Sequence, residues 1–247
     1  MLKSERKQLI MEKLTEEGFV TLDKLIAMLA TSESTVRRDL DELESERKLH
    51  RVHGGAELPK SLSRELTNQQ KSIKNIHHKA LIAQKASSLI SDNDVIFIDA
   101  GTTSELLLEY LFQENLTVVT NSIHHASKLV EKDIKTVIVG GFVKHTTDAS
   151  IGCTAVDQIS KMNFDKAFIG MNGIDENFLT TPDVEEAVIK KVVIENAQES
   201  FVLVDSSKLG QFSFAKVDKI DKVTIVTNYS EGALMRKIRE KTKVIEV

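Results

Sequence analysis

The sequence has 247 residues, a length that fits one small domain plus one domain of ordinary size. Hydrophobic residues make up 41% and charged residues 28% of it, as in globular proteins, and no run reaches the ~20 apolar residues that a membrane span needs. The net charge of −4 excludes a uniformly basic nucleic-acid-binding chain, so any contact with nucleic acid has to come from a local group of cations.

The cysteine and histidine content narrows the class further. The single cysteine, Cys153, excludes an internal disulfide and fits the reducing cytosol. No Cys/His spacing is typical of a metal site, and the adjacent pairs at 77–78 and 124–125 are interpreted as surface or structural histidines. The first ten residues are polar and charged, so we expect no secretory signal. Together, these observations lead us to expect a cytoplasmic protein with no metal and no cofactor.

Residues 1–57 predict a small helical domain. Apolar spacing favours helices at about 4–17, 21–30 and 32–48, the first of which ends at Gly18. In the third helix, Val36, Leu40 and Leu43 share one face, which we expect to be buried.

The start of the third helix is typical of a DNA-recognition helix. Hydroxyl and guanidinium groups crowd its first two turns on the side opposite the apolar face, where hydroxyls can reach phosphates and an arginine can reach a guanine edge. The alternative is an ordinary solvated helix surface. The candidate DNA-contact residues are Ser32, Ser34, Thr35, Arg37 and Arg38.

Residues 49–56 predict a wing beside that helix. The segment is short, β-prone and basic, and it bends at two adjacent glycines, as a β-hairpin does. Arg51 is the expected phosphate or groove contact, with help from His50 and His53.

Residues 58–75 are polar and contain Pro59, which indicates a linker. From residue 76 onward, helical patterns alternate with short β-branched runs, which predicts an α/β domain at 76–247 with a mainly parallel sheet and helices on its faces. The runs are at 95–98, 117–119, 136–139, 167–169, 201–204, 224–226 and 244–247.

The residues after the first of these strands suit an anion. Gly101 allows close approach of the backbone to a ligand, and Thr102, Thr103 and Ser104 offer hydroxyls beside the free amides of a helix start. The alternative is an ordinary helix cap, for which one hydroxyl suffices.

Further strand ends carry small or polar residues, and the carboxyl ends of parallel strands meet at one edge of a sheet. Lys208 and then Lys144 are the best cations for a sugar phosphate, and Glu186 can accept hydrogen bonds from sugar hydroxyls, unless it merely pairs with Lys190 one turn later. The other candidates at these ends are Thr120, Asn121, Gly141, Gly152, Asn172, Gly173 and Asp175.

Two segments resemble the DeoR family of bacterial regulators: Ser-Glu-Ser-Thr-Val-Arg-Arg-Asp-Leu-Asp-Glu-Leu at 32–43 and Arg-Val-His-Gly-Gly-Ala at 51–56. The resemblance implies a winged helix-turn-helix whose DNA contacts include Ser34, Thr35, Arg37 and Arg38; we expect Asp39 to pair with a neighbouring arginine and orient it. It also implies an effector domain similar to ribose-5-phosphate isomerases, glucosamine-6-phosphate deaminases and CoA transferases. The matching segments there are Asp99 to Ser104, Thr120 and Asn121, Gly140 and Gly141, Gly152, Gly173 to Asp175, Glu186, and Asp205 to Lys208.

Within the family, the segments at 140–146, 180–183 and 207–214 are most similar to fructose operon repressors of low-GC Gram-positive bacteria. The resemblance implies release from operator DNA by fructose 1-phosphate, with tagatose 6-phosphate or another sugar phosphate as alternatives. Cys153 stands where a small residue is usual, so we expect it to be a small buried hydrophobe. We further expect a homodimer or homotetramer, because a single short module binds DNA too weakly.

Two other functions remain open at this stage: a sugar-phosphate isomerase with an N-terminal extension, and a sugar-phosphate sensor that acts through protein partners. The related isomerases carry a pair of carboxylates in the loop that corresponds to 172–176. Here Asp175 is one carboxylate, and the adjacent Glu176 would point away from it in an extended segment. We therefore predict a binding protein and not an enzyme.

Overall fold

The structure is a computed structural model that describes residues 2–46, 48–52, 54–58, 62 and 65–247. The chain forms two compact units, Met1–Ser61 and Leu62–Val247. The boundary falls within the segment 58–75, for which we predict a linker, so most of that segment belongs to the second unit. Among the described residues, no helix is both long and apolar enough to cross a membrane.

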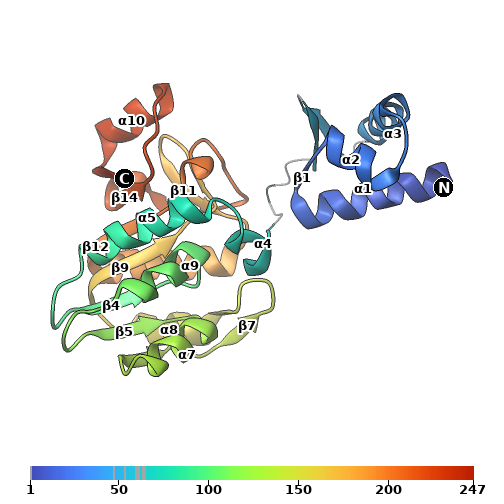
Figure 1. Ribbon diagram of the computed structural model, residues 1–247. Helices are drawn as coiled ribbons and strands as arrows, with labels where there is room; N and C mark the ends of the chain where they lie inside the picture. Colours follow the sequence, from blue (N-terminus) through green and yellow to red (C-terminus); the bar gives the residue numbers. More distant parts are fainter. Residues whose placement is uncertain (1, 47, 53, 59–61, 63–64) are drawn as a thin grey trace. The chain divides into compact units, whose positions relative to one another are not determined.

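The N-terminal unit consists of three helices and a small antiparallel sheet (Figure 1). Its elements are α1 (Lys3–Glu17), β1 (Phe19–Thr21), α2 (Leu22–Leu29), α3 (Glu33–Ser45), β2 (His50–Val52) and β3 (Gly55–Glu57). Ile10, Leu40 and Leu49 belong to its single buried core. The predicted winged helix is confirmed. The unpredicted strand β1, too short to show a period, pairs with β3 and adds a third strand to the wing.

A seven-stranded parallel sheet is the centre of the C-terminal unit (Figure 1). Its strands are β4 (Val95–Ile98), β5 (Thr117–Thr120), β6 (Lys135–Ile138), β9 (Phe164–Gly170), β12 (Ala197–Leu203), β14 (Thr224–Thr227) and β15 (Val244–Glu246). Each strand contains or overlaps one of the predicted runs. The order is β15-β14-β12-β9-β4-β5-β6, so the chain leaves β4 toward one edge and later returns to β9 on its other side.

Helices pack against both faces of this sheet, as predicted. Ile96 and Ile98 of β4 point into one core and Phe97 points into the other, because side chains alternate along a strand. Helices α5 (Ile76–Ser87), α6 (Thr102–Leu107) and α7 (Ile123–Glu131) contribute to the first core, and α8 (Cys153–Ile159), α9 (Val184–Asn196) and α10 (Ala233–Lys241) contribute to the second.

Smaller elements lie between the strands. They are α4 (Asn68–Ser72), the hairpin of β7 (Phe142–Lys144) and β8 (Ala149–Ile151), the sheet of β10 (Gly173–Ile174), β11 (Phe178–Thr181) and β13 (Ala215–Lys219), and 3₁₀ turns at Leu108–Tyr110, Ser206–Lys208 and Ile220–Lys222.

Helix α4 lies within the predicted linker. Thr67 Oγ1 accepts a hydrogen bond from the Gln70 amide (3.2 Å), and Gln70 Oε1 accepts one from the Thr67 amide (3.1 Å), which forms a capping box. This Thr-x-x-Gln pattern is a readable helix signal within a polar segment.

Candidate DNA-contact surface and ligand pocket

Hydroxyl groups gather at the start of α3. Ser32 Oγ accepts a hydrogen bond from the Thr35 amide (3.4 Å) and lies 3.1 Å from Ser34 Oγ and 2.9 Å from Thr35 Oγ1. Ser32 therefore caps the helix. Because Val36 and Leu40 are buried, the exposed Ser34 faces the solvent on the opposite side.

The predicted DNA-contact arginines differ in their intramolecular partners. Arg37 Nη2 lies 2.6 Å from Glu33 Oε1, one turn earlier, and Arg51 pairs with Asp41 of α3. Arg38 is exposed, and within the described part of the chain it forms no hydrogen bond or ion pair. Arg38 is thus the guanidinium most available to a partner molecule. His53 lies outside the described residues.

Asp39 pairs with an arginine, but with Arg6 of α1 and not with Arg37 or Arg38. The Arg6 guanidinium donates from Nε to Asp39 Oδ2 (2.8 Å) and from Nη2 to Oδ1 (3.2 Å), and the Asp39 side chain is almost fully buried. The expected role is therefore corrected: Asp39 joins α3 to α1 and does not orient the exposed arginines.

In the C-terminal unit, a cavity of about 90 Å³ lies at the carboxyl ends of β4, β9 and β12. These strands are neighbours in the sheet. Between β4 and β9 the order in which the chain adds strands reverses, and ligands of open α/β folds bind at such a point. The predicted ligand-binding residues that line the cavity are Asp99, Gly101, Thr102, Thr103, Asn172, Glu186 and Lys208.

Two lysines line this cavity without a carboxylate in contact. Lys79 Nζ donates to Thr102 Oγ1 (3.0 Å) and to the backbone carbonyl of Lys71, and its side chain is 5% exposed. Burial lowers the pKa of Lys79 to about 8, and burial also lowers the pKa of Lys208. Among the described residues neither ammonium has an ion-pair partner, so these two side chains favour a bound anion.

A third lysine of the cavity is neutralised within the protein. Lys190 Nζ pairs with Asp99 Oδ2, which also accepts a hydrogen bond from the Gly170 amide (3.0 Å). Burial by itself would lower the pKa of Lys190, but the carboxylates of Asp99 and Glu186 outweigh it and raise that pKa. Lys190 thus forms its ion pair with Asp99 and not with Glu186, the partner considered from the sequence.

Glu186 joins the cavity to the β7–β8 hairpin. Its Oε1 accepts hydrogen bonds from Thr147 Oγ1 (2.9 Å) and from Lys144 Nζ (3.1 Å). Lys144 Nζ also lies 2.5 Å from Glu65 Oε2 and 2.8 Å from Asp183 Oδ2. Burial would lower the pKa of Lys144, but these carboxylates raise it, so Lys144 is firmly charged and shared.

Other predicted ligand residues support the loops around the cavity without lining it. Asn121 Oδ1 accepts from the Ala100 amide (3.1 Å), and Thr120 Oγ1 accepts from the Ser122 amide (3.1 Å). Asp175 Oδ1 accepts from the amides of Asn177 and Phe178 (both 2.7 Å), which closes the β10–β11 turn. Lys144, Ser104, Gly141 and Gly152 also lie outside the cavity lining.

Packing explains Gly173. A Cβ atom at Gly173 would lie 2.4 Å from the backbone oxygen of Gln211, so only glycine fits against that chain segment. Cys153, expected to be a buried hydrophobe, is exposed at the start of α8, and that expectation is wrong.

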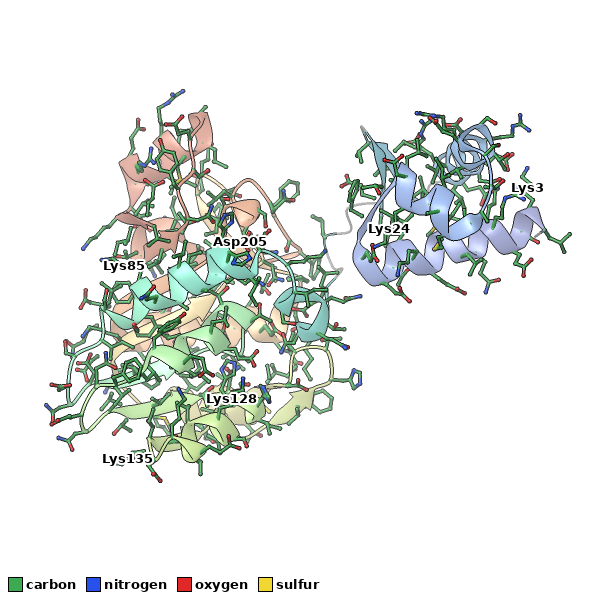
Figure 2. All side chains as sticks on the ribbon, viewed as in Figure 1. Lys3, Lys24, Lys85, Lys128, Lys135 and Asp205 are labelled. Carbon is green, nitrogen blue, oxygen red and sulfur yellow. The ribbon has the colours of Figure 1, made fainter. Side chains whose placement is uncertain are left out.

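The sequence pattern did not single out several residues that line the cavity. Lys79 and Lys190 stand on helices, where a lysine gives no sign of whether it faces solvent or a cavity. Lys71, Lys74 and Thr147 are further examples, and the two lysines come from the predicted linker. Asp205, which belongs to the segment from Asp205 to Lys208 singled out above, also lines the cavity. It follows β12, where Figure 2 labels it, and accepts a hydrogen bond from Asn75 Nδ2 (2.8 Å).

Comparison with known proteins agrees with this architecture. Residues 6–62 match the DeoR-like helix-turn-helix domain, and residues 74–229 match the DeoR C terminal sensor domain. The chain is 40% identical over 246 residues to the HTH-type transcriptional regulator FruR of Bacillus subtilis, covering 99% of this chain and 98% of that protein. It is 31% identical over 251 residues to the lactose phosphotransferase system repressor of Staphylococcus aureus, covering 100% of both.

Among solved structures, ribose 5-phosphate isomerase A from Methanocaldococcus jannaschii aligns with a TM-score of 0.40 and 24% identity over 55% of each chain. The eIF2B delta subunit from Chaetomium thermophilum aligns with a TM-score of 0.46 and 14% identity over 76% of this chain and 60% of that one. The two domain matches and the full-length relatives decide the assignment: this chain belongs to the DeoR family of DNA-binding transcriptional regulators.

Proposed function

We propose that this regulator represses a sugar-utilisation operon and releases its operator when a sugar phosphate, best fructose 1-phosphate, binds in the C-terminal cavity. The observation that supports it most is a pair of lysines in the cavity lining, the buried Lys79 and the half-buried Lys208, which have no carboxylate in contact among the described residues. A phosphate dianion supplies the missing charge. The fructose assignment rests on the segments at 140–146, 180–183 and 207–214.

The lining of the cavity offers groups for both parts of such a ligand. The phosphate would lie against Lys79 and Lys208, with the hydroxyls of Thr102 and Thr103 as further donors. The sugar would lie against the remaining polar residues, where Glu186 can accept from its hydroxyl groups, together with Asn172 and Asp99.

A thermal-shift screen tests this proposal. Fructose 1-phosphate at a hundred times its dissociation constant should stabilise the protein by about 2.7 kcal/mol. Fructose 1,6-bisphosphate and tagatose 6-phosphate should stabilise less at equal concentration, and fructose without phosphate should leave the melting temperature unchanged. Equal stabilisation by fructose and its 1-phosphate would contradict a phosphate-binding cavity.

The isomerase alternative is tested on the same samples. Asp175 is engaged in a turn and Glu176 pairs with Lys237 (2.6 Å), so neither lies free beside the cavity as a second catalytic carboxylate. We therefore propose no turnover. Phosphorus NMR of overnight incubations with ribose 5-phosphate and fructose phosphates should show unchanged substrate, and catalytic conversion would overturn this part of the proposal.

DNA contact is proposed for the exposed side of α3 and for the wing: Ser32, Ser34, Thr35, Arg37, Arg38, Arg51 and His53. Arg38→Ala should weaken operator binding by about 1–3 kcal/mol if the guanidinium contacts a base edge, because Arg38 has no partner among the described residues to lose in the free protein. Fluorescence anisotropy with operator DNA measures the effect.

Arg37→Ala is a useful comparison: it removes another proposed DNA contact but also breaks the pair with Glu33, so it should change both stability and binding. Operator affinity of Arg38→Ala equal to that of the wild type would remove Arg38 from the interface. Binding to a symmetric operator further implies a homodimer or homotetramer. Analytical ultracentrifugation measures the molar mass and therefore the number of protomers.

A further inference from the structure

Two chains of contacts lead from Glu186, a carboxylate of the cavity, to residues 65–68. These residues come shortly after Leu62, where the C-terminal unit begins, so they are close in sequence to the winged helix.

The first chain of contacts consists of charged groups. Glu186 Oε1 lies 3.1 Å from Lys144 Nζ, and Lys144 Nζ lies 2.5 Å from Glu65 Oε2. The other oxygen of Glu65 lies 2.7 Å from Lys71 Nζ. The Glu65 side chain is 7% exposed; burial would raise its pKa, but the two lysines hold it below its usual range. Glu65 is therefore a buried carboxylate that depends on Lys144 and Lys71.

The second chain of contacts runs through neutral groups. Thr147 Oγ1 donates to Glu186 Oε1 (2.9 Å), and the backbone carbonyl of Thr147 accepts from Asn68 Nδ2 (2.7 Å). The Asn68 amide donates to the carbonyl of Thr146 (3.0 Å). The N-terminus of α4 is thus bonded to the same hairpin turn that contacts Glu186.

Both series of contacts begin at the same atom, Glu186 Oε1. Lys144 and Thr147 contact Glu186 Oε1, and Glu186 also lines the cavity. A sugar hydroxyl that donates to this carboxylate takes up part of its negative charge, which weakens the contacts of Lys144 and Thr147 with Oε1 and strengthens the hold of Glu65 and Asp183 on Lys144. Occupancy of the cavity and the position of residues 65–68 are therefore linked through a shared cation.

We propose that the Glu186–Lys144–Glu65 contact couples ligand occupancy to the chain leading to the winged helix, so that Glu65 determines how strongly the ligand changes operator affinity. Glu65 does not line the cavity, so it acts as a positioning residue and not as a ligand contact. The inference rests on the proposed function and adds to it the route by which the cavity regulates DNA binding.

The experiment compares the full-length wild type with Glu65→Gln. The quantity measured is the ratio of operator dissociation constants with and without saturating fructose 1-phosphate, obtained by fluorescence anisotropy. The wild-type ratio should lie between about 5 and 150, and in Glu65→Gln it should fall to less than about a fifth of that value. Calorimetry should still detect fructose 1-phosphate binding to the variant, and operator affinity without ligand should change by less than about threefold.

Asp183→Asn is the matched control. It removes another carboxylate from the same ammonium while an asparagine keeps the cap on α9, and it has no contact with residues 65–68 among those described. Its ratio should equal the wild-type ratio. A wild-type ratio in Glu65→Gln would overturn the coupling route, whereas a wild type that does not respond to fructose 1-phosphate would overturn the proposed function and the route with it.

Should Glu65→Gln unfold, Asn68→Ala interrupts the parallel contact with the Thr147 carbonyl and should lower the same ratio. An unchanged ratio in a folded Asn68→Ala protein that binds fructose 1-phosphate would likewise count against the route.

Discussion

Replacing Lys190 with methionine should lower the free energy of unfolding of the C-terminal unit by about 3–5 kcal/mol. Lys190 is 5% exposed, and its ammonium is paired with the equally buried Asp99. Without Lys190, the buried Asp99 carboxylate keeps, among the described residues, only the Gly170 amide as a hydrogen-bond donor, and its charge is left unbalanced. Urea denaturation followed by circular dichroism at pH 7 measures the loss.

Two variants test the cause of that loss. Lys191→Met removes the next lysine on α9. Lys191 is exposed, and its ammonium lies 3.8 Å from Glu195 Oε1, a long and solvent-exposed ion pair, so the change should alter stability by less than about 0.5 kcal/mol. The double variant Asp99→Asn with Lys190→Met removes both charges and should recover much of the stability, because an asparagine oxygen can still accept from Gly170. A double variant as unstable as Lys190→Met would attribute the loss to packing instead of charge.

The pH dependence of this contribution has a definite sign. The pKa of Lys190 is raised in the folded protein, so its contribution to stability is complete below the ordinary lysine pKa and is lost only as the pH rises through the higher folded value. The difference between wild type and Lys190→Met should therefore be constant from pH 6 to 9.

The sheet could be predicted from the sequence because buried parallel strands consist of short β-branched and aromatic runs, such as 95–98 and 201–204. The position of the cavity followed from topology: polar residues after β4, β9 and β12 converge once the strands are parallel neighbours. Asp99, Thr102, Asn172 and Lys208 were predicted as one site for that reason, and they do line one cavity.

The sequence could not assign the residues whose role depends on tertiary packing. Lys79 and Lys190 belong to helices whose lysines look alike until the helices are placed against the sheet. Gly173 and Asp175 have the polar, flexible character of ligand loops, but the backbone of Gln211 and the β10–β11 turn explain them. Loop composition therefore predicts the position of the cavity more reliably than the individual residues that line it.

The segment 58–75 illustrates a different limit. Its polar composition predicts a linker, yet residues 65–75 fold onto the C-terminal unit through Glu65, Asn68 and Asn75. These contacts are polar and therefore invisible to a search for apolar periodicity; the capping box at Thr67 and Gln70 was the available signal.

Lys79→Met should have opposite effects on stability and on ligand binding. The buried ammonium of Lys79 has no carboxylate in contact among the described residues, so an apolar side chain of similar length should raise the free energy of unfolding by about 1–3 kcal/mol at pH 7. The same change removes a charge-assisted contact with the ligand phosphate, which should weaken fructose 1-phosphate binding by about 2–5 kcal/mol.

The effect on stability follows from the lowered pKa of Lys79, about 8 in the folded protein. The unfavourable charge is present below that pH and disappears as the pH rises toward the ordinary lysine value, so the stability gained by Lys79→Met should shrink in the same range. Phosphate binding should restore the charge, and calorimetry at pH 8.5 in buffers of different ionisation enthalpy should detect more proton uptake by the wild type than by Lys79→Met, in which only Lys208 of the two lysines remains.

Lys85→Met is the matched control, because Lys85 is exposed on the same helix (Figure 2) and should leave both stability and binding unchanged. A residue kept at the cost of stability is expected where binding requires it, since the apo protein then carries a buried charge that Asp205 offsets only in part and that a bound phosphate can neutralise. Lys79→Met that binds fructose 1-phosphate as tightly as the wild type would place the phosphate elsewhere. A loss of stability in Lys79→Met would instead show that the contacts with Thr102 and the Lys71 carbonyl outweigh the buried charge.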